Sequence, residues 1–364
     1  MRHLLSQLRS LQGFSQRSAT IPSETLYKYK HCKHCQLHQP ALKTVSHNPY
    51  QSLRHCSSNI RESNWSVHSL ESRGVVRLKG TDTVPFLQGL VTNDVAVVGD
   101  KTPSLYTLML NVQGRVLYDL LMFHATDVTG KSFLLLECDT NVTEDLLKLI
   151  KRYKIRKKVD IADVTDSCKV FAALCKGDDQ KISVDKQLPG ILSAAPDPRM
   201  NSFGLRIIAS NSGSVLKGFG VKEETPEEDY HRERYQIGIG EGVVDLPPGN
   251  CFPLESNAVY LNGVCFHKGC YVGQELTART FHTGVTRKRL MPLLFDDEPQ
   301  NIIAGSNIVT ETGKSVGKMR GHIGKYGLGL LRIAEASKNL SVKTETEENL
   351  GVKATTPDWW PKES

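Results

Sequence analysis

Apolar and polar residues alternate along the middle of the chain in short runs that predict strands mixed with helices. Alternation with period two indicates strands, and apolar residues three or four positions apart indicate helices. Strands are expected near 75–78, 104–112, 116–124, 132–137, 159–164 and 170–174. Helices are expected over 83–91, from a cap at Asn141 through Ile150, and after a capping box at 225–228. Because hairpins accompany the helices, the pattern predicts an α+β body.

The second half of the chain is less regular. A Pro- and Asp-containing stretch, 188–200, and the path from Asp245 to Gly263 are expected to lack regular structure. From Leu290 onward, short alternating apolar segments are broken by glycines, which predicts a small β-barrel-like module. The charged end, 343–364, is expected to be loose, with the pair Trp359 and Trp360 available to hold it to the body.

The first residues carry a different pattern. Leu4, Leu8, Leu11 and Phe14 share one face of a helix, and three arginines point the other way. An amphipathic, Arg-rich and acid-poor start is typical of a mitochondrial import signal, while the alternative is a disordered basic arm. We therefore expect three parts: a disordered transit peptide over 1–64, an α+β body of two intertwined subdomains over 65–288, and the barrel-like module with its loose tail over 289–364.

The net charge of +7 belongs to this leading segment. Residues 1–61 hold nine basic and one acidic side chain, and the rest of the chain balances at −1. The basic cluster between Lys148 and Lys158 is interpreted as a solvated helix end, because no aromatic residues are interleaved with it. No apolar run approaches the roughly 18 residues of a membrane helix. We expect neither a nucleic acid nor a membrane as partner.

The chain has nine cysteines, three of them in the leading segment. Cys32 and Cys35 lie among histidines, but no second ligand pair follows at zinc-finger spacing. The other six are scattered, and the pattern is typical of reduced intracellular thiols. These six are Cys138, Cys168, Cys175, Cys251, Cys265 and Cys270.

The octapeptide Lys-Gly-Cys-Tyr-Val-Gly-Gln-Glu is the strongest candidate for a functional site. Two glycines bracket Cys270, and Lys268 places a cation two residues away, which favours a thiolate. A thiolate can be a nucleophile, a redox centre or a metal ligand, whereas a buried cysteine is a small apolar residue. The candidate thiol site comprises Lys268, Gly269, Cys270, Tyr271, Gly273, Gln274 and Glu275.

This thiol cannot hold an iron–sulfur cluster by itself. A cluster takes about four cysteine ligands, and no cysteine follows Cys270. Cys265 precedes it at a ferredoxin-like distance, but the other cysteines have no recognisable spacing. A cluster at Cys270 would therefore take its remaining ligands from a partner.

The octapeptide, followed by Leu-Thr-Ala-Arg279, resembles the motif of the YgfZ-type proteins, a branch of the superfamily of the tetrahydrofolate-dependent aminomethyltransferase, the glycine-cleavage T-protein. The similarity extends over roughly residues 66–335, through the segments 73–82, 86–94, 109–119 and 253–257. With the import signal, the chain resembles the mitochondrial (Iba-type) iron–sulfur cluster assembly factors of this branch. The resemblance implies a folate-binding α+β body with a C-terminal β-barrel, and maturation of mitochondrial [4Fe-4S] proteins in the matrix with A-type scaffold proteins.

The same resemblance implies a folate pocket formed by Asn111, Asp119, Gln236 and Arg279. T-proteins carry two adjacent aspartates where this chain has Tyr118 and Asp119, and their pterin-binding glutamate corresponds to Gln236. Glutamine supplies no carboxylate, so T-protein catalysis is not expected. Tetrahydrofolate binding stays open.

Three hypotheses follow. In the first, the protein is a non-enzymatic assembly factor, and Cys270 contributes one thiolate to a [2Fe-2S] or [4Fe-4S] cluster shared with an A-type scaffold, while Lys268, Tyr271 and Gln274 stabilise that thiolate. In the second, it is a tetrahydrofolate-dependent one-carbon transferase or demethylase that uses Asp119. In the third, Cys270 is a redox or thiol-transfer centre, for which Cys265 is the nearest resolving thiol in the sequence.

Overall fold

The computed structural model describes residues 64–176, 189–300, 302–344 and 349–362. The predicted import signal and the three cysteines of the leading segment lie outside the described residues. The described residues all belong to one compact unit. None of the helices in the described ranges is long and apolar enough to cross a bilayer.

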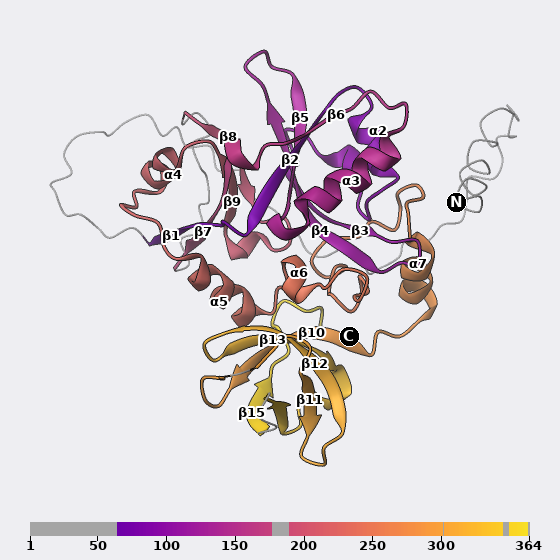
Figure 1. The fold of residues 1–364 in the computed structure, drawn as a ribbon, viewed down its shortest axis with the longest axis vertical. Helices are drawn as coiled ribbons and strands as arrows, with labels where there is room; N and C mark the ends of the chain where they lie inside the picture. Colours follow the sequence, from indigo (N-terminus) through magenta and orange to yellow (C-terminus); the bar gives the residue numbers. More distant parts are fainter. Residues whose placement is uncertain (1–63, 177–188, 301, 345–348, 363–364) are drawn as a thin grey trace, which may run out of the picture. The chain divides into compact units, whose positions relative to one another are not determined.

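A five-stranded antiparallel sheet forms the centre of the body, with strand order β3-β4-β5-β2-β6. Its strands are β2 (Arg73–Lys79), β3 (Ser104–Leu110), β4 (Val116–Thr126), β5 (Ser132–Asp139) and β6 (Asp160–Asp163). Figure 1 shows α2 (Thr83–Gln88) and α3 (Thr143–Lys154) in front of this sheet. Successive residues of a strand point to opposite faces of the sheet, and Val75 and Val76 of β2 belong to different apolar clusters. Both faces of this sheet are therefore buried.

A second antiparallel sheet has strand order β1-β7-β9-β8. Its strands are β1 (Trp65–Ser69), β7 (Lys169–Cys175), β8 (Ile191–Pro196) and β9 (Leu205–Ala209). The helix α4 (Ser212–Phe219) packs against β1. The strand β8 corrects our expectation that 188–200 is irregular. It pairs with β9 through a register shift between Ile191 and Ser193, which hides the period-two signal.

The last six strands close into a barrel, ordered β10-β13-β12-β11-β14-β15. They are β10 (Lys288–Phe295), β11 (Asn307–Thr310), β12 (Ser315–Ile323), β13 (Tyr326–Arg332), β14 (Leu340–Lys343) and β15 (Asn349–Ala354). The predicted fold class, α+β with a C-terminal barrel, is confirmed. The chain end is held to the body, because the Trp359 indole N–H donates to the Ile237 carbonyl at 2.7 Å.

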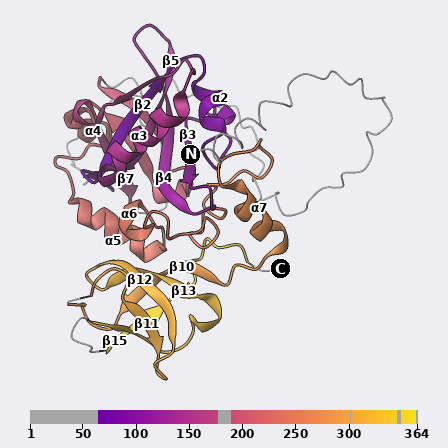
Figure 2. The same ribbon diagram turned by 45° about the vertical axis from the view of Figure 1, so that its right-hand side comes forward.

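Short helices connect these units. The helices α5 (Glu227–Ile237) and α6 (Gly242–Asp245) both contact the barrel strand β12, and α7 (Gln274–Thr283) leads into β10. Figure 2 shows α7 and the loop before it beside the body. Single 3-10 turns complete the chain: η1 (Val95–Val97), η2 (Thr140–Val142), η3 (Thr165–Ser167), η4 (Asn201–Phe203) and η5 (Ile333–Glu335).

Two predicted helix caps are wrong. Asn141 lies in η2, where its backbone N–H donates to Asp139, and α3 begins later at Thr143 without a side-chain cap. Thr225 uses its backbone N–H to pair with the Val67 carbonyl, and α5 has no side-chain cap at its start. At Thr225 a bond to a distant strand replaces the predicted cap, and at Asn141 a short turn with Asp139 does so.

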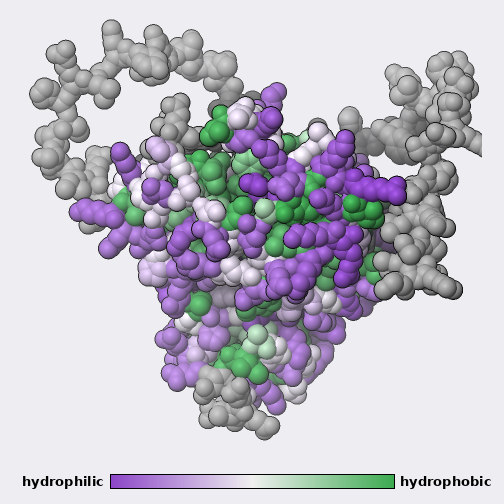
Figure 3. All heavy atoms as spheres, turned by 45° about the horizontal axis from the view of Figure 1, so that its top comes forward, coloured by the Kyte–Doolittle hydropathy of each residue, from purple (hydrophilic) through white to green (hydrophobic). Residues whose placement is uncertain are grey.

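Charged side chains of the predicted basic cluster lie in solvent. Lys151, Arg152, Arg156, Lys157 and Lys158 are exposed at and after the end of α3. Lys148 forms an ion pair with Glu144 one helical turn away, at 2.7 Å. Figure 3 shows hydrophilic side chains over much of the visible face, with apolar patches between them.

Candidate functional site

The thiol motif occupies a loop and the first turn of α7. Cys270 is exposed at the loop, while Tyr271 immediately after it is 7% exposed. The motif then enters α7 through Gly273, whose left-handed backbone (φ 77°) forms the helix N-cap. The sulfur therefore faces solvent on a segment whose next residue is fixed in the core.

Main-chain carbonyls of residues 89–93 hold this loop along its length. The backbone N–H of Cys265 donates to the Thr92 carbonyl at 3.0 Å, and that of Val272 donates to the Gly89 carbonyl at 3.1 Å. These two bonds flank Cys270. Backbone bonds on both sides of the thiol restrict how far the loop can move.

Lys268 forms a third anchor. Its ammonium donates to the carbonyls of Val91 and Asn93, both at 2.7 Å, and lies 5.1 Å from the centre of the Tyr271 ring. Burial lowers the pKa of Lys268 to about 8. No hydrogen bond joins this ammonium to the Cys270 sulfur within the described ranges. The cation that we expected beside the thiolate thus fastens the loop to the body.

The other polar residues of the motif arrange the turn into α7. The Gln274 side-chain oxygen accepts a hydrogen bond from the backbone N–H of Tyr271 at 3.3 Å. Burial raises the pKa of Tyr271 to about 12, and its hydroxyl has no partner among the described residues. Glu275 is exposed in the first turn of α7, where the helix dipole favours an acidic side chain. These contacts give Gln274 and Tyr271 positioning roles.

Gly273 seats the motif against the turn between β3 and β4. A Cβ atom at this position would clash with the Asn111 carbonyl and come within 2.9 Å of the Leu110 Cβ. Gly114, across the same contact, is also left-handed (φ 78°) and lies close to the Gly273 carbonyl. The loop can reach this position only with glycine at residue 273.

We expect Gly273→Ala to destabilise the protein and displace the thiol loop. A left-handed backbone alone costs a non-glycine residue about 1–2 kcal/mol, and the clash with Asn111 adds to that cost. Urea unfolding measures the loss, and labelling of Cys270 with a maleimide reports the loop. Gly269→Ala is the matched control, because a Cβ there meets no atom within 4 Å. Equal stability of the two variants would contradict the proposed seating.

Lys268 should also leave a signature in the pH dependence of stability. Its pKa falls from 10.5 to about 8 on folding, so the unfolded chain binds more protons between these values. The free energy of unfolding contributed by this group therefore rises as the pH increases through that window. Urea unfolding of Lys268→Met at pH values across the window should lack this increment. A slope identical to that of the wild type would show that Lys268 keeps its ordinary pKa when folded.

The buried cysteines of the body are poorly suited to act as co-ligands of Cys270. Cys138, Cys168 and Cys251 are buried, and burial raises the pKa of each thiol to about 11. Across the described residues, no three His, Cys, Asp or Glu side chains group so that they could hold a metal ion. Within this part of the chain Cys270 is a solitary exposed thiol.

The body also contains a buried network of charges that no pattern in the sequence marks. Glu241 forms ion pairs with Arg199 at 2.7 Å and with Arg206, and accepts a hydrogen bond from the Tyr230 hydroxyl at 2.8 Å. Burial alone would raise the pKa of Glu241, but Arg206 and Arg199 hold it well below its usual range. The other members are Arg73, Asp119, Glu137, Asp197, Arg234 and Asp245. The sequence hints at this network only through charged residues within predicted strands, such as Arg77 and Glu137. Such residues do not show by themselves whether a charge is buried or exposed.

The four residues expected to form a folate pocket lie in different surroundings. Asp119 is buried, 3.5 Å from Arg73, and accepts from the Gly242 N–H at 3.1 Å. The Asn111 side chain instead closes the β3–β4 turn, where it accepts from two backbone N–H groups. Gln236 and Arg279 are exposed on α5 and α7. No hydrogen bond or ion pair joins any two of the four within the described ranges.

Comparisons with known proteins agree with this architecture. A family model described as the CAF17 C-terminal beta-barrel domain matches residues 287–362. The protein named "Iron-sulfur cluster assembly factor IBA57, mitochondrial" of Mus musculus is 42% identical over 310 residues, covering 82% of this chain and 86% of the relative. The protein of the same name from Homo sapiens is 37% identical over 308 residues, with the same two coverages.

A solved structure gives the same result for the fold. Glycine cleavage system aminomethyltransferase T from Bartonella henselae matches with a TM-score of 0.62, over 82% of this chain and 87% of that chain. The two sequences are 13% identical, so this likeness concerns the fold alone. It confirms the predicted aminomethyltransferase-like arrangement of the body and barrel.

Proposed function

Because the chain belongs to the IBA57 family of mitochondrial iron–sulfur cluster assembly factors, we propose that it matures mitochondrial [4Fe-4S] proteins together with an A-type scaffold protein. In this proposal Cys270 donates one thiolate to a cluster that the scaffold also ligates. The cluster is cargo that passes between proteins. The protein acts without catalysis of its own, in the mitochondrial matrix.

The observation that carries the proposal is the solitary exposure of Cys270 on an anchored loop. A cluster needs about four ligands, and the described residues gather no group of three or more candidate ligands around this thiol. An incomplete ligand set suits a transient cluster, because the partner must supply the remaining thiolates and can withdraw them. The carbonyl anchors fix where the shared cluster forms.

Mixing the protein with a cluster-loaded A-type scaffold tests the proposal. Size-exclusion chromatography should give a joint peak that absorbs in the visible range, while the protein alone stays colourless after the same cluster reconstitution. A stable cluster on the isolated protein, or a joint peak without visible absorbance, would refute a cluster shared through Cys270.

A folate-dependent transferase is the second candidate, favoured by the shared fold and the buried Asp119. No hydrogen bond or ion pair joins Asp119 to Asn111, Gln236 or Arg279 among the described residues, and a pocket shared by the four stays a prediction. We derive no catalytic step from them. Calorimetric titration with tetrahydrofolate tests binding, and turnover of a methylamine donor would establish the transferase.

A further inference from the structure

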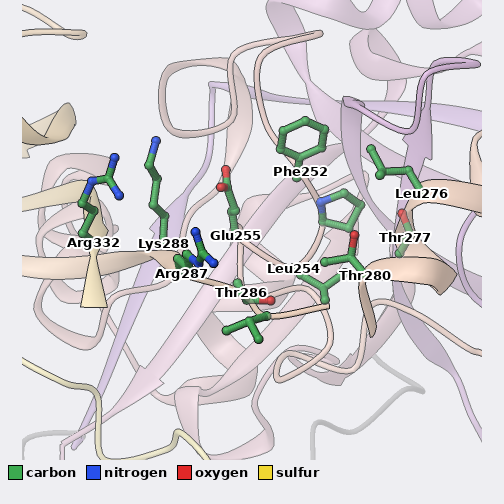
Figure 4. A pocket seen from close by; sticks show the side chains of 12 residues that line it. Phe252, Leu254, Glu255, Leu276, Thr277, Thr280, Thr286, Arg287, Lys288 and Arg332 are labelled. Atoms are coloured by element: carbon green, nitrogen blue, oxygen red, sulfur yellow. The ribbon is translucent and has the colours of Figure 1, made fainter. Parts of the chain in front are cut away.

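A groove of about 360 Å³ runs beside α7, on the same helix that follows the thiol loop. Leu276, Thr277 and Thr280 of α7 form one wall, and the loop of Phe252 and Glu255 forms another (Figure 4). The start of the barrel closes its far end. This volume lies at the low end of ligand sites, about 300–1,000 Å³, and suits a short segment of chain.

Three cations that form no close ion pair with a described residue line the far end of the groove. Lys288 and Arg332 lie directly opposite each other in the β10–β13 register, and Arg287 precedes Lys288. Like charges opposite one another destabilise a sheet. None of the three makes an ion pair with a described residue. An anionic ligand would remove this repulsion.

Glu255 is the one acidic side chain among the groove residues. Burial raises its pKa, against the opposing charges of Lys288, Arg320 and Arg115. Two further arginines therefore lie close enough to act on the groove. The balance of charge remains strongly positive even with Glu255 ionised.

The rest of the groove offers an apolar surface and free main-chain atoms. Val285 is 77% exposed, and Phe252 and Leu276 line the groove with it. The backbone groups of Val285 and Thr286, between α7 and β10, make no hydrogen bond to another described residue. An extended peptide can pair with free main-chain groups while its side chains contact neighbouring apolar residues.

We propose that this groove binds an extended acidic segment, with one large apolar side chain, of the protein partner that meets Cys270. The carboxylates contact Arg287, Lys288 and Arg332, and the apolar side chain packs between Val285 and Leu276. From Gln274 to Thr280 the helix rises about 9 Å, so one partner can reach both the groove and the thiol. This inference rests on the proposed function only for the identity of the partner.

Two labelled peptides test the groove without a cluster or a scaffold. The probe is fluorescein-labelled Glu-Glu-Asp-Glu-Leu-Phe, and the control probe is Lys-Lys-Arg-Lys-Leu-Phe, each followed by fluorescence anisotropy. The acidic probe should bind, and its affinity should fall when salt rises from about 50 to about 300 mM. Absence of binding, or equal binding of the basic probe, would overturn the proposal.

Paired charge reversals supply the matched control. Lys288→Glu with Arg332→Glu should weaken binding of the acidic probe at least about tenfold. Lys151→Glu with Arg152→Glu changes the net charge equally on the exposed end of α3 and should leave binding unchanged. An equal loss of affinity in both double variants would show that binding depends on net charge alone, and would overturn the proposal. Complete displacement of the probe by micromolar citrate would identify a small-anion site and overturn the peptide proposal.

The failure of this inference can be told apart from failure of the proposed function. Cys270→Ser should bind the acidic probe like the wild type, because it leaves the groove intact. The Lys288 and Arg332 reversal should weaken the cluster-free complex with the scaffold, whereas the serine variant should retain it. A scaffold complex indifferent to the reversal would exclude the groove as its docking site.

Discussion

Cys270→Ser should abolish the visible absorbance of the complex with an A-type scaffold while leaving the protein folded. The thiol is exposed and makes no hydrogen bond to another described residue, so its replacement should change the free energy of unfolding by less than about 0.5 kcal/mol. Serine is a poor ligand for iron at neutral pH, because its hydroxyl stays protonated. Absorbance of the isolated joint peak measures the loss.

The control for this result is Cys265→Ser. Cys265 is partly buried, its thiol acts electrostatically on Lys268 and Tyr271, and its backbone bond to Thr92 is preserved by the substitution. The Cys265 variant should therefore form the coloured complex at the wild-type level. Loss of colour in both variants would favour a site that uses two thiols of this chain. Retention of colour in Cys270→Ser would refute the shared ligand.

Glu241→Ala should cause the largest loss of stability of any single substitution discussed. The side chain is buried and pairs with Arg199 and Arg206, and it accepts from the Tyr230 hydroxyl. Removing one partner of a buried ion pair leaves uncompensated charge, which costs about 3–5 kcal/mol. Urea unfolding followed by circular dichroism measures the change.

Glu228→Ala is the matched control on the neighbouring helix α5. Its carboxylate is 64% exposed and lies 3.8 Å from Arg232, so the pair contributes at most about 1 kcal/mol. A comparable loss of unfolding free energy in both variants would show that the buried network stabilises the protein no more than an exposed ion pair does. A Glu241→Ala protein as stable as the wild type would imply that its arginines find other partners.

Local patterns predicted much of the architecture. The hairpin around Gln113 and Gly114 forms as expected between β3 and β4, because its turn and both strands are signalled within a few residues. The barrel followed from the glycine-broken apolar segments after Leu290. These features depend on neighbours in the sequence, so periodicity reveals them.

Features that depend on distant partners were not predictable. The sequence around Thr225 predicts a helix cap, yet its backbone N–H donates to the carbonyl of Val67 in the first strand. Lys268 reads as a cation beside a thiol, yet its ammonium reaches carbonyls that precede it by more than 170 residues. The charge network is assembled from several strands and helices, and no periodicity marks which charged residues are buried together.

The anchoring of the thiol loop has a consequence for mutational tolerance. The Lys268 ammonium and the backbone N–H groups of Cys265 and Val272 all donate hydrogen bonds to main-chain carbonyls of residues 89–93. Every amino acid carries such a carbonyl, so side-chain changes there can leave the anchors in place. An alanine scan would report what the buried side chains of Val91, Thr92 and Asn93 contribute to the fold, and would not report the carbonyls that hold the thiol loop. Insertion or deletion of a single residue between Gly89 and Asn93 would shift all the acceptors at once, and is the change to which this site is most sensitive.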